Sequence, residues 1–389
     1  MGTFRNLFDV LREDSYQEIE EEASREVTVA LAGNNTEIRN RLHDSLSTRL
    51  ESLWTPSPFR LVDSNERPTA EGDEDSGMLI YALYQGDRIP TEKKRWLSDL
   101  ARSSSVKVMV VAIDRNSGKD FNRESGVSRR LQSFNPLRLV GGKETNASNA
   151  AADGAAFNSP EAEVRSNWLV ELDNLAQEAR QNLTVVQLSG LETWELEAEL
   201  LPLIVQRLSG RELALARRAP IFRNTVAGHL IGKTSRANAE TVLLANVTAG
   251  IPILSGFFGS GADFVFLTKN QFELSHRLAS VYGQKRDSRV EVYLEVAPIL
   301  GAAFLWKAIS SAASNRVPVF IATPIKAAIA YAATTVVGRV AQVYYASGRK
   351  APAQVAAMMR NLFEQLTGLS ARKVDKDEPG STPRRLRSS

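Results

Sequence analysis

The chain has 389 residues, with 48 basic side chains, 45 acidic side chains and no cysteine. This length predicts two domains, each long enough to bury a core. The net charge of +3 is too small to indicate a general affinity for nucleic acid. The lack of cysteine excludes disulfides, thiolate zinc sites and cysteine nucleophiles. Because the N-terminal segment is acidic and has no long apolar run, we expect a cytoplasmic protein.

The first half of the chain alternates between strand patterns and helix patterns. Residues 1–25 place apolar side chains at helical spacing, which predicts an amphipathic helix packed on the first domain. Residues 27–33 form a buried-strand pattern, and the next segment repeats apolar residues every four positions from Ile38 to Leu50. Further strands are predicted at residues 59–64, 77–83, 106–113 and 183–189, and further helices at residues 91–103 and 159–181. This alternation predicts an α/β fold whose mostly parallel sheet is covered by helices on both faces.

The composition of the chain changes after residue 210. Residues 26–210 make up the predicted α/β domain, with a small, polar and flexible insertion at residues 141–159 and a closing helix that ends at Gly210. From residue 211 to residue 350 the chain is rich in small and aliphatic residues and shows no strand alternation. We expect a separate all-α domain there, followed at residues 351–389 by a terminal helix and a basic disordered tail.

The segment after the first strand can be compared with a phosphate-binding loop, whose pattern is G-x-x-x-x-G-K-[ST]. In that register Gly33 keeps the first glycine, but Ile38 replaces the second glycine and Arg39 replaces the lysine. Asn40 stands where a hydroxyl would bind Mg²⁺. A β-branched residue does not readily adopt the backbone angles of glycine. The simplest interpretation is therefore that Gly33 ends a strand and that Arg39 is a solvated cation.

The ends of the later strands carry remnants of other nucleotide motifs. Asp63 stands where a D-x-x-G motif would begin, but Glu66 replaces its glycine and would repel a γ-phosphate. Residues 113–116 keep none of the side chains with which an N-K-x-D motif reads guanine. Ser189 stands at the position of the last GTPase motif, S-A, which contacts the nucleotide through its backbone. The simplest interpretation of Asp63 is a capping carboxylate. The three histidines have no partners at ligand spacing, and we expect neither a metal site nor a catalytic residue.

The order and spacing of these elements resemble two known families. Residues 26–209 resemble an Era-like small GTPase domain, of the P-loop GTPase type, with eroded nucleotide chemistry. Residues 215–283 and 325–348 resemble the YcjF-type helical domain of unknown function, which follows an Era-like domain in many bacterial proteins. The resemblance implies a degenerate nucleotide site at Gly33, Asn34, Arg39, Asn40, Asp63 and Ser189.

Two classes of function follow from this resemblance. In the first, the protein is a catalytically degenerate GTPase-like scaffold or regulator that needs no cofactor and acts through its helical domain. In the second, it is a divergent but functional hydrolase of GTP or another nucleoside triphosphate, with GTP and Mg²⁺ as ligands. The loss of four determinants at once favours the scaffold.

An apolar run in the helical domain raises the question of a membrane. Residues 242–262 carry no charge over about the length that spans a bilayer, but they contain Asn246 and a Gly-Ile-Pro break. A second run, from residue 317, is interrupted by Lys326. We expect residues 211–350 to meet a membrane surface or a hydrophobic partner, at the cytoplasmic face of the inner membrane. Insertion as a hairpin, packing in a helical bundle and formation of a homo-oligomer stay open, and no nucleic-acid partner is expected.

Overall fold

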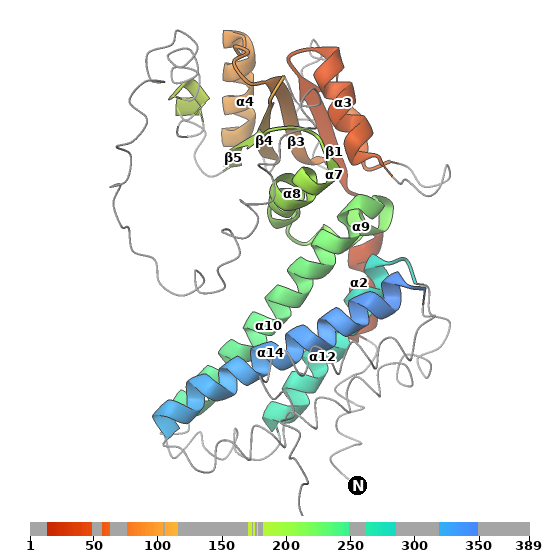
Figure 1. The fold of residues 1–389 in the computed structure, drawn as a ribbon, viewed down its shortest axis with the longest axis vertical. Coiled ribbons are helices and arrows are strands. Elements are labelled where there is room, and N and C mark those ends of the chain that lie inside the picture. The colour runs from red at the N-terminus through yellow and green to blue at the C-terminus, as the bar shows by residue number, and fades with distance from the viewer. Residues whose placement is uncertain are drawn as a thin grey trace, which may run out of the picture. The chain divides into compact units, whose positions relative to one another are not determined.

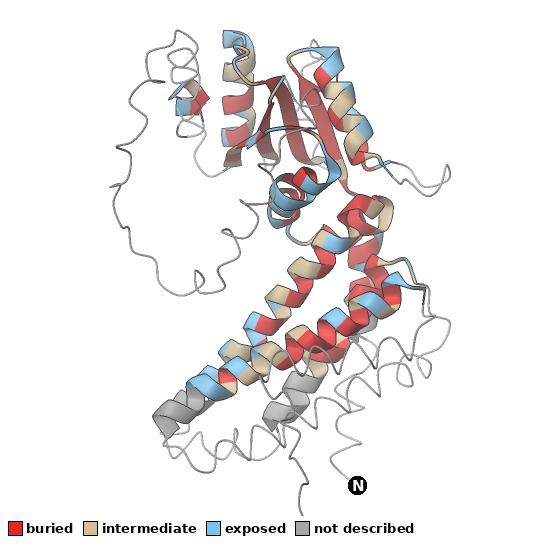
Figure 2. Cartoon of the chain, in the orientation of Figure 1, coloured by how far each residue is buried: buried red, intermediate tan, exposed pale blue. Residues whose placement is uncertain are grey.

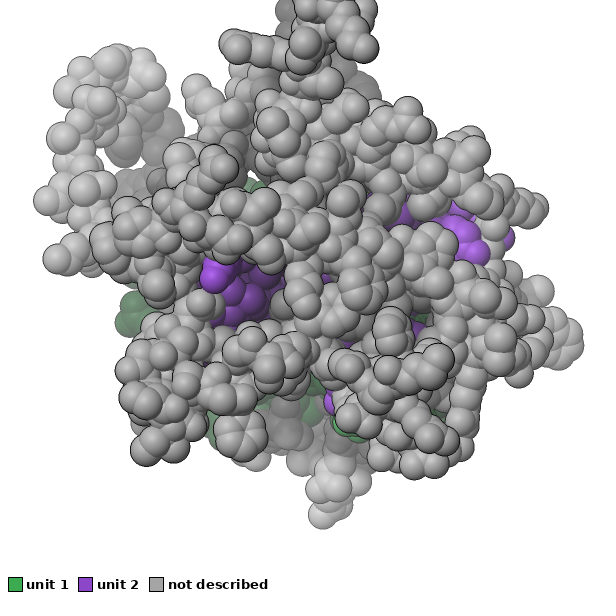
Figure 3. All heavy atoms as spheres, turned by 90° about the horizontal axis from the view of Figure 1, so that it is seen from below, with its two compact units in different colours: residues 1–230, 276–285 green, residues 231–275, 286–389 purple. Residues whose placement is uncertain are grey.

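The computed structural model describes ten stretches of the chain, and the chain divides into two compact units. Unit 1 comprises residues 1–230 and 276–285, and unit 2 comprises residues 231–275 and 286–389 (Figure 3). The described residues are 14–48, 57–62, 76–103, 106–115, 170–172, 174–175, 177, 182–248, 262–284 and 319–348.

Unit 1 contains a parallel sheet, which confirms the predicted α/β fold (Figure 1). Among the described residues the sheet has five strands in the order β2-β1-β3-β4-β5, and every pairing is parallel. This is the order of flavodoxin-like doubly wound sheets, and it does not by itself define a phosphate-binding loop. The strands are β1 (Thr28–Gly33), β2 (Phe59–Leu61), β3 (Ser76–Tyr84), β4 (Lys107–Ile113) and β5 (Leu183–Leu188).

Both faces of the sheet are buried, as the apolar strand patterns predict (Figure 2). Four successive residues of β1, from Val29 to Ala32, are all buried, and successive strand residues point to opposite faces. Helix α4 (Thr91–Ser103) packs Leu97 and Ala101 into the cluster on one face. Helix α3 (Thr36–Leu46) lies against β1, β2 and β3. Its predicted apolar stripe is buried from Ile38 to Leu46, and Leu50 lies outside the described residues.

Helical segments complete unit 1. The predicted closing helix consists of α7 (Thr193–Glu195), the π-helical segment η3 (Leu196–Leu200) and α8 (Leu201–Arg207). Gly210 follows with a φ of 84°, the left-handed conformation that glycine supplies after a helix end. Helix α2 (Asp14–Ser24) packs against α9 (Glu212–Arg218), which leads through η4 (Pro220–Phe222) into α10.

Several predicted segments lie wholly or partly outside the described residues. Of the helix predicted at residues 159–181, the described residues 170–172, 174–175 and 177 are helical. The apolar N-terminal positions up to residue 13, the insertion at residues 141–159 and the terminal segment at residues 351–389 all lie outside them.

The described part of residues 211–350 is helical, as predicted, in α10 (Arg223–Thr248), α12 (Ala262–Val281) and α14 (Val319–Ala346). The division into units falls after Leu230, however, and not after Gly210. Helix α9 remains with unit 1 because its buried residues, from Glu212 to Ala216, belong to a segment that packs on α2. The predicted domain boundary at residue 210 stays a prediction.

Within the part of the chain that the structure describes, no helix is both long and apolar enough to cross a bilayer. Of the apolar run at residues 242–262, the structure describes only the last turns of α10 and the first residue of α12. Leu243 and Leu244 of α10 are exposed.

Candidate functional site at the carboxyl edge of the sheet

The topology of the sheet places a candidate site between β1 and β3. The chain leaves β1 to form β2 on one side and returns to form β3 on the other side. In open α/β sheets, ligands bind beyond the carboxyl ends of the strands at such a reversal of strand order. The predicted site residues Gly33 and Asn34 lie at this point, at the end of β1.

The connection from β1 to α3 consists of only two residues, Asn34 and Asn35. Asn35 is the N-cap of α3, and its side chain accepts a hydrogen bond from the backbone N–H of Ile38 at 2.9 Å. Ile38, which replaces the second glycine of the P-loop pattern, is thus a fully buried residue in the first turn of α3. Helix α3 thus begins at Thr36, at a position that would still belong to the loop around the phosphate in a P-loop.

Gly33 has a structural reason to be glycine. A Cβ atom at this position would lie 3.0 Å from the carbonyl oxygen of Ala82 on the neighbouring strand β3. The backbone N–H of Asn34 donates to the same oxygen at 3.0 Å. The close approach of the two strands therefore explains the glycine without a phosphate.

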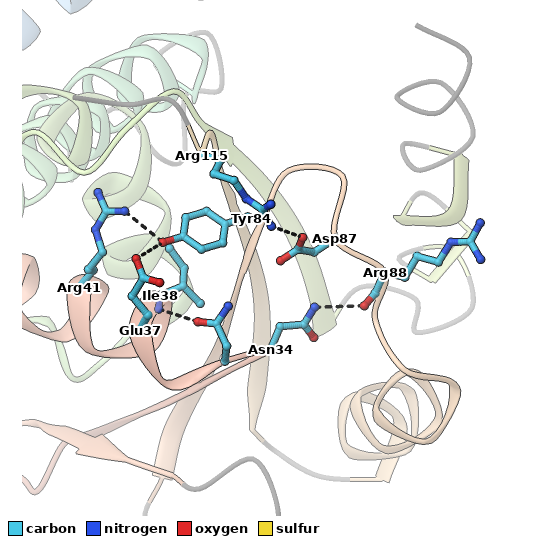
Figure 4. A network of polar contacts seen from close by, with 9 residues as sticks. Asn34, Glu37, Ile38, Arg41, Tyr84, Asp87, Arg88 and Arg115 are labelled. Carbon is cyan, nitrogen blue, oxygen red and sulfur yellow. Dashed lines mark hydrogen bonds and ion pairs between the residues drawn. The ribbon is translucent and has the colours of Figure 1, made fainter. Parts of the chain in front are cut away.

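The side chain of Asn34 is held by two neighbours. Its Oδ1 accepts a hydrogen bond from the Tyr81 hydroxyl at 2.7 Å. Its Nδ2 donates to the carbonyl oxygen of Arg88 at 3.0 Å, as Figure 4 shows. Burial raises the pKa of Tyr81 to about 12, so this hydroxyl keeps its proton and remains a donor. Asn34 therefore joins the end of β1 to β3 and to the loop that follows β3.

Tyr84, the last residue of β3, is the centre of a second set of contacts. Its hydroxyl donates to Glu37 Oε1 at 2.9 Å and accepts from Arg41 Nη1 at 3.1 Å, both from α3 (Figure 4). The guanidinium of Arg115 lies 5.1 Å from the centre of the Tyr84 ring and pairs with Asp87 at 2.7 Å. Beyond β3, these side chains therefore bond to one another.

Arg39 and Asn40 lie on α3 but do not converge on one point. Arg39 Nη1 donates to the carbonyl oxygen of Val62, directly after β2, at 2.9 Å. Its Nε is buried and has no hydrogen-bond partner among the described residues. Because that atom has no contact with solvent, a phosphate could reach it only if neighbouring side chains moved. Asn40 is exposed, and Asp63 lies outside the described residues.

Ser189 follows β5 at the same edge of the sheet. Its side chain is exposed, and its backbone N–H donates to the buried carboxylate of Glu195 on α7. Gln85 Nε2 and the backbone N–H of Asp114 both donate to the carbonyl oxygen of Leu188, each at 3.0 Å. The ends of β3, β4 and β5 are thereby tied together by contacts within the protein.

Sequence reasoning missed the side chains that dominate this edge, namely Glu37, Arg41, Tyr81 and Tyr84. Two tyrosines in an otherwise aliphatic strand were an available signal, because a buried hydroxyl needs a partner. Among the described residues no three histidine, aspartate or glutamate side chains lie close enough together to hold a metal ion.

Comparison of the chain with protein-family models, with curated proteins and with solved structures finds no match. The resemblance of residues 26–209 to an Era-like domain, and of the helical part to a YcjF-type domain, stays a prediction. The candidate site therefore rests on the geometry of the described residues.

Proposed function

We propose that this protein is a GTPase-like scaffold whose α/β unit performs no nucleotide chemistry and whose helical part engages a membrane surface or a hydrophobic partner. One observation carries the first half of the proposal. At the reversal of strand order, where a ligand is expected, Asn34, Tyr84 and Arg39 bond to groups of the protein itself.

Binding of a phosphate at this edge would require several of these contacts to break. Arg39 would have to leave the carbonyl oxygen of Val62, and Asn34 would have to leave Tyr81. Each such hydrogen bond contributes about 1 kcal/mol, and a buried group left without a partner costs more. Within this segment the backbone N–H groups of Asn34, Ile38 and Arg39 are already bonded to groups of the protein. These costs favour the scaffold over the divergent hydrolase.

Equilibrium binding of fluorescent GTP and ATP to the full chain, with Mg²⁺, tests this half. We expect no saturable binding and no Mg²⁺-dependent hydrolysis above background. If a nucleotide does bind, guanine should not be preferred over adenine, because Asn116 stands where a carboxylate would read the guanine edge. Hydrolysis that disappears in the Gly33→Trp and Arg39→Met variants would instead establish the divergent hydrolase.

The second half of the proposal rests on exposed apolar side chains of unit 2. The Ser235 hydroxyl lies 3.0 Å from the Thr335 hydroxyl, and Asn238 Nδ2 donates to Thr334 Oγ1 at 2.9 Å. Because the residue number rises along α10 while it falls along α14, the two helices run antiparallel. If the same pairing continues along both helices, the end of α10 lies beside the first half of α14. Large apolar side chains are exposed on both segments: Leu243, Leu244, Ile325 and Tyr331. Such exposure is typical of surfaces that meet a partner or a membrane.

Cosedimentation with lipid vesicles tests the membrane surface as the target. We expect the full chain to pellet with vesicles and the Leu243→Ser/Leu244→Ser variant to stay in the supernatant. The control is Leu61→Ser, which removes an exposed leucine from unit 1. A full chain that stays in solution as a discrete monomer or dimer, without detergent, would leave a protein partner or a second copy as the target.

A further inference from the structure

Helix α2 presents a narrow apolar stripe with one acidic side chain on each side of it. Ile19 and Ala23, one helical turn apart, are buried. At 100° per residue, Glu20 and Glu22 point about 80° to either side of the line through these two residues. A surface that receives this stripe would therefore meet a carboxylate at each of its two borders.

The surface that holds α2 offers a cation at each border. Glu20 Oε1 lies 2.6 Å from Arg217 Nη1 on α9, and Glu22 Oε2 lies 2.6 Å from Arg277 Nη1 near the end of α12. All of these residues belong to unit 1. Helix α2 runs beside α9 in Figure 1. Two helices far apart in the sequence thus supply one arginine each to the same acidic helix.

We infer that α9 and the end of α12 form a receptor for an acidic amphipathic helix, that α2 is its intramolecular occupant, and that a partner helix of the same pattern can replace α2. The pattern is Ile-Glu-x-Glu-Ala, as in residues 19–23. The inference does not depend on whether the carboxyl edge of the sheet binds a nucleotide.

The kind of contact explains why α2 can be exchanged. The Arg217–Glu20 pair is partly exposed, with side-chain exposures of 27% and 45%. In the second pair Arg277 is 28% exposed, whereas Glu22 is buried. An ion pair that is open to water is weakened by salt, so the Arg217–Glu20 pair holds its side of α2 only weakly. Three residues connect α2 to β1 and keep α2 at a high local concentration. A partner helix therefore competes well only when the contacts between α2 and the receptor are weakened.

Two full-chain variants and two peptides test the receptor. The Glu20→Arg/Glu22→Arg variant makes α2 positively charged, so that α2 leaves the receptor. The Arg217→Glu/Arg277→Glu variant reverses the charge of the receptor itself. The probes are fluorescent peptides of residues 14–26, one native and one carrying the same Glu20→Arg/Glu22→Arg change. The matched control variant is Glu18→Arg/Glu21→Arg, which changes the charge of α2 equally at two exposed positions.

We expect the native peptide to bind the Glu20→Arg/Glu22→Arg chain, and the charge-reversed peptide to bind the Arg217→Glu/Arg277→Glu chain. A peptide and a chain of mismatched charge should bind at least about tenfold more weakly, because their charges repel. The wild-type chain and the control variant should also bind either peptide at least about tenfold more weakly, because α2 occupies their receptor. Added salt should weaken both matched complexes. The chain with all four changes should recover the melting temperature of the wild type, which shows that the reversed receptor still folds.

Two results would overturn the inference. The first is binding of either peptide with no preference for the opposite charge. The second is a Glu20→Arg/Glu22→Arg chain that melts cooperatively and still binds neither peptide.

Discussion

The carboxyl edge of the sheet in unit 1 and the interior of unit 2 both hold networks of polar side chains, but in different surroundings. At the edge, Tyr84 bonds to Glu37 and Arg41, whose charged groups are partly open to water. In unit 2 the fully buried Asn238 donates to Thr334 and accepts a hydrogen bond from Asn270 at 2.6 Å. Water can replace a lost partner only at the edge. The loss of a contact in the edge network should therefore cost the fold little, whereas the buried network determines how helices of unit 2 pack.

The largest effect is expected from Asn238→Ala. This change removes a hydrogen-bond partner from the buried Thr334 on α14 and from the half-buried Asn270 on α12, and it leaves a cavity. We expect a loss of about 2–4 kcal/mol in the free energy of unfolding. Denaturation in urea measures it. The control is Thr241→Val, which removes a hydroxyl that donates to Ala237 within the same helix. If both variants lose the same stability, the contrast between the two networks fails.

The next effect concerns pH and belongs to the sheet. The folded protein raises the pKa of Tyr81 from the ordinary value of 10.0 to about 12, because the phenol is buried. The folded state therefore holds this proton more tightly than the unfolded state. The resulting stabilisation is complete below pH 10.0 and is lost as the pH rises to about 12. We expect a loss of about 2–3 kcal/mol over that interval.

Urea denaturation across this pH range measures the effect, with Tyr81→Phe as the variant that lacks the titrating group. The variant should be less stable than the wild type at neutral pH, because Asn34 loses its donor. It should also lose less stability between pH 10 and 12. Equal slopes in the two proteins would show that Tyr81 does not titrate as described.

A smaller effect is expected from close packing in unit 2. A Cβ atom at Gly338 of α14 would lie 2.7 Å from Ile231 Cγ1 and 3.2 Å from Leu274 Cδ2. We expect Gly338→Ala to cost about 1–3 kcal/mol through overpacking. Gly232→Ala on α10 is the matched control, because a Cβ atom there meets nothing within 4 Å. The control should stabilise its helix by up to about 1 kcal/mol. If both variants changed the free energy of unfolding in the same direction, this would contradict the packing described.

The smallest effect is expected at the edge network itself. Tyr84→Phe keeps the ring under Arg115 and removes the hydroxyl that joins Glu37 and Arg41. We expect a loss of about 1 kcal/mol, since water can solvate both charged groups. Thermal denaturation measures it. A loss as large as that of Asn238→Ala would mean that the edge is as tightly built as the helical interior.

The sequence predicts the frame of unit 1 because the frame depends on local patterns. Apolar runs mark all five described strands, and the repeat of Ile38, Leu42 and Leu46 marks the buried face of α3. The contacts of the site depend on pairs distant in the sequence. Nothing local indicates that the Tyr84 hydroxyl meets Glu37, or that Glu20 meets Arg217 across 197 positions. These distant pairs also explain why the division into units differs from the change in composition.

Backbone hydrogen exchange of residues 33–40 in the full chain, with and without millimolar GTP and Mg²⁺, tests most directly whether the carboxyl edge is filled by the protein itself. The N–H groups of Asn34 and Ile38 bond to Ala82 and Asn35. We expect their exchange rates to stay the same when nucleotide is added. Slower exchange confined to residues 33–40, caused by GTP and absent in the Arg39→Met variant, would contradict it.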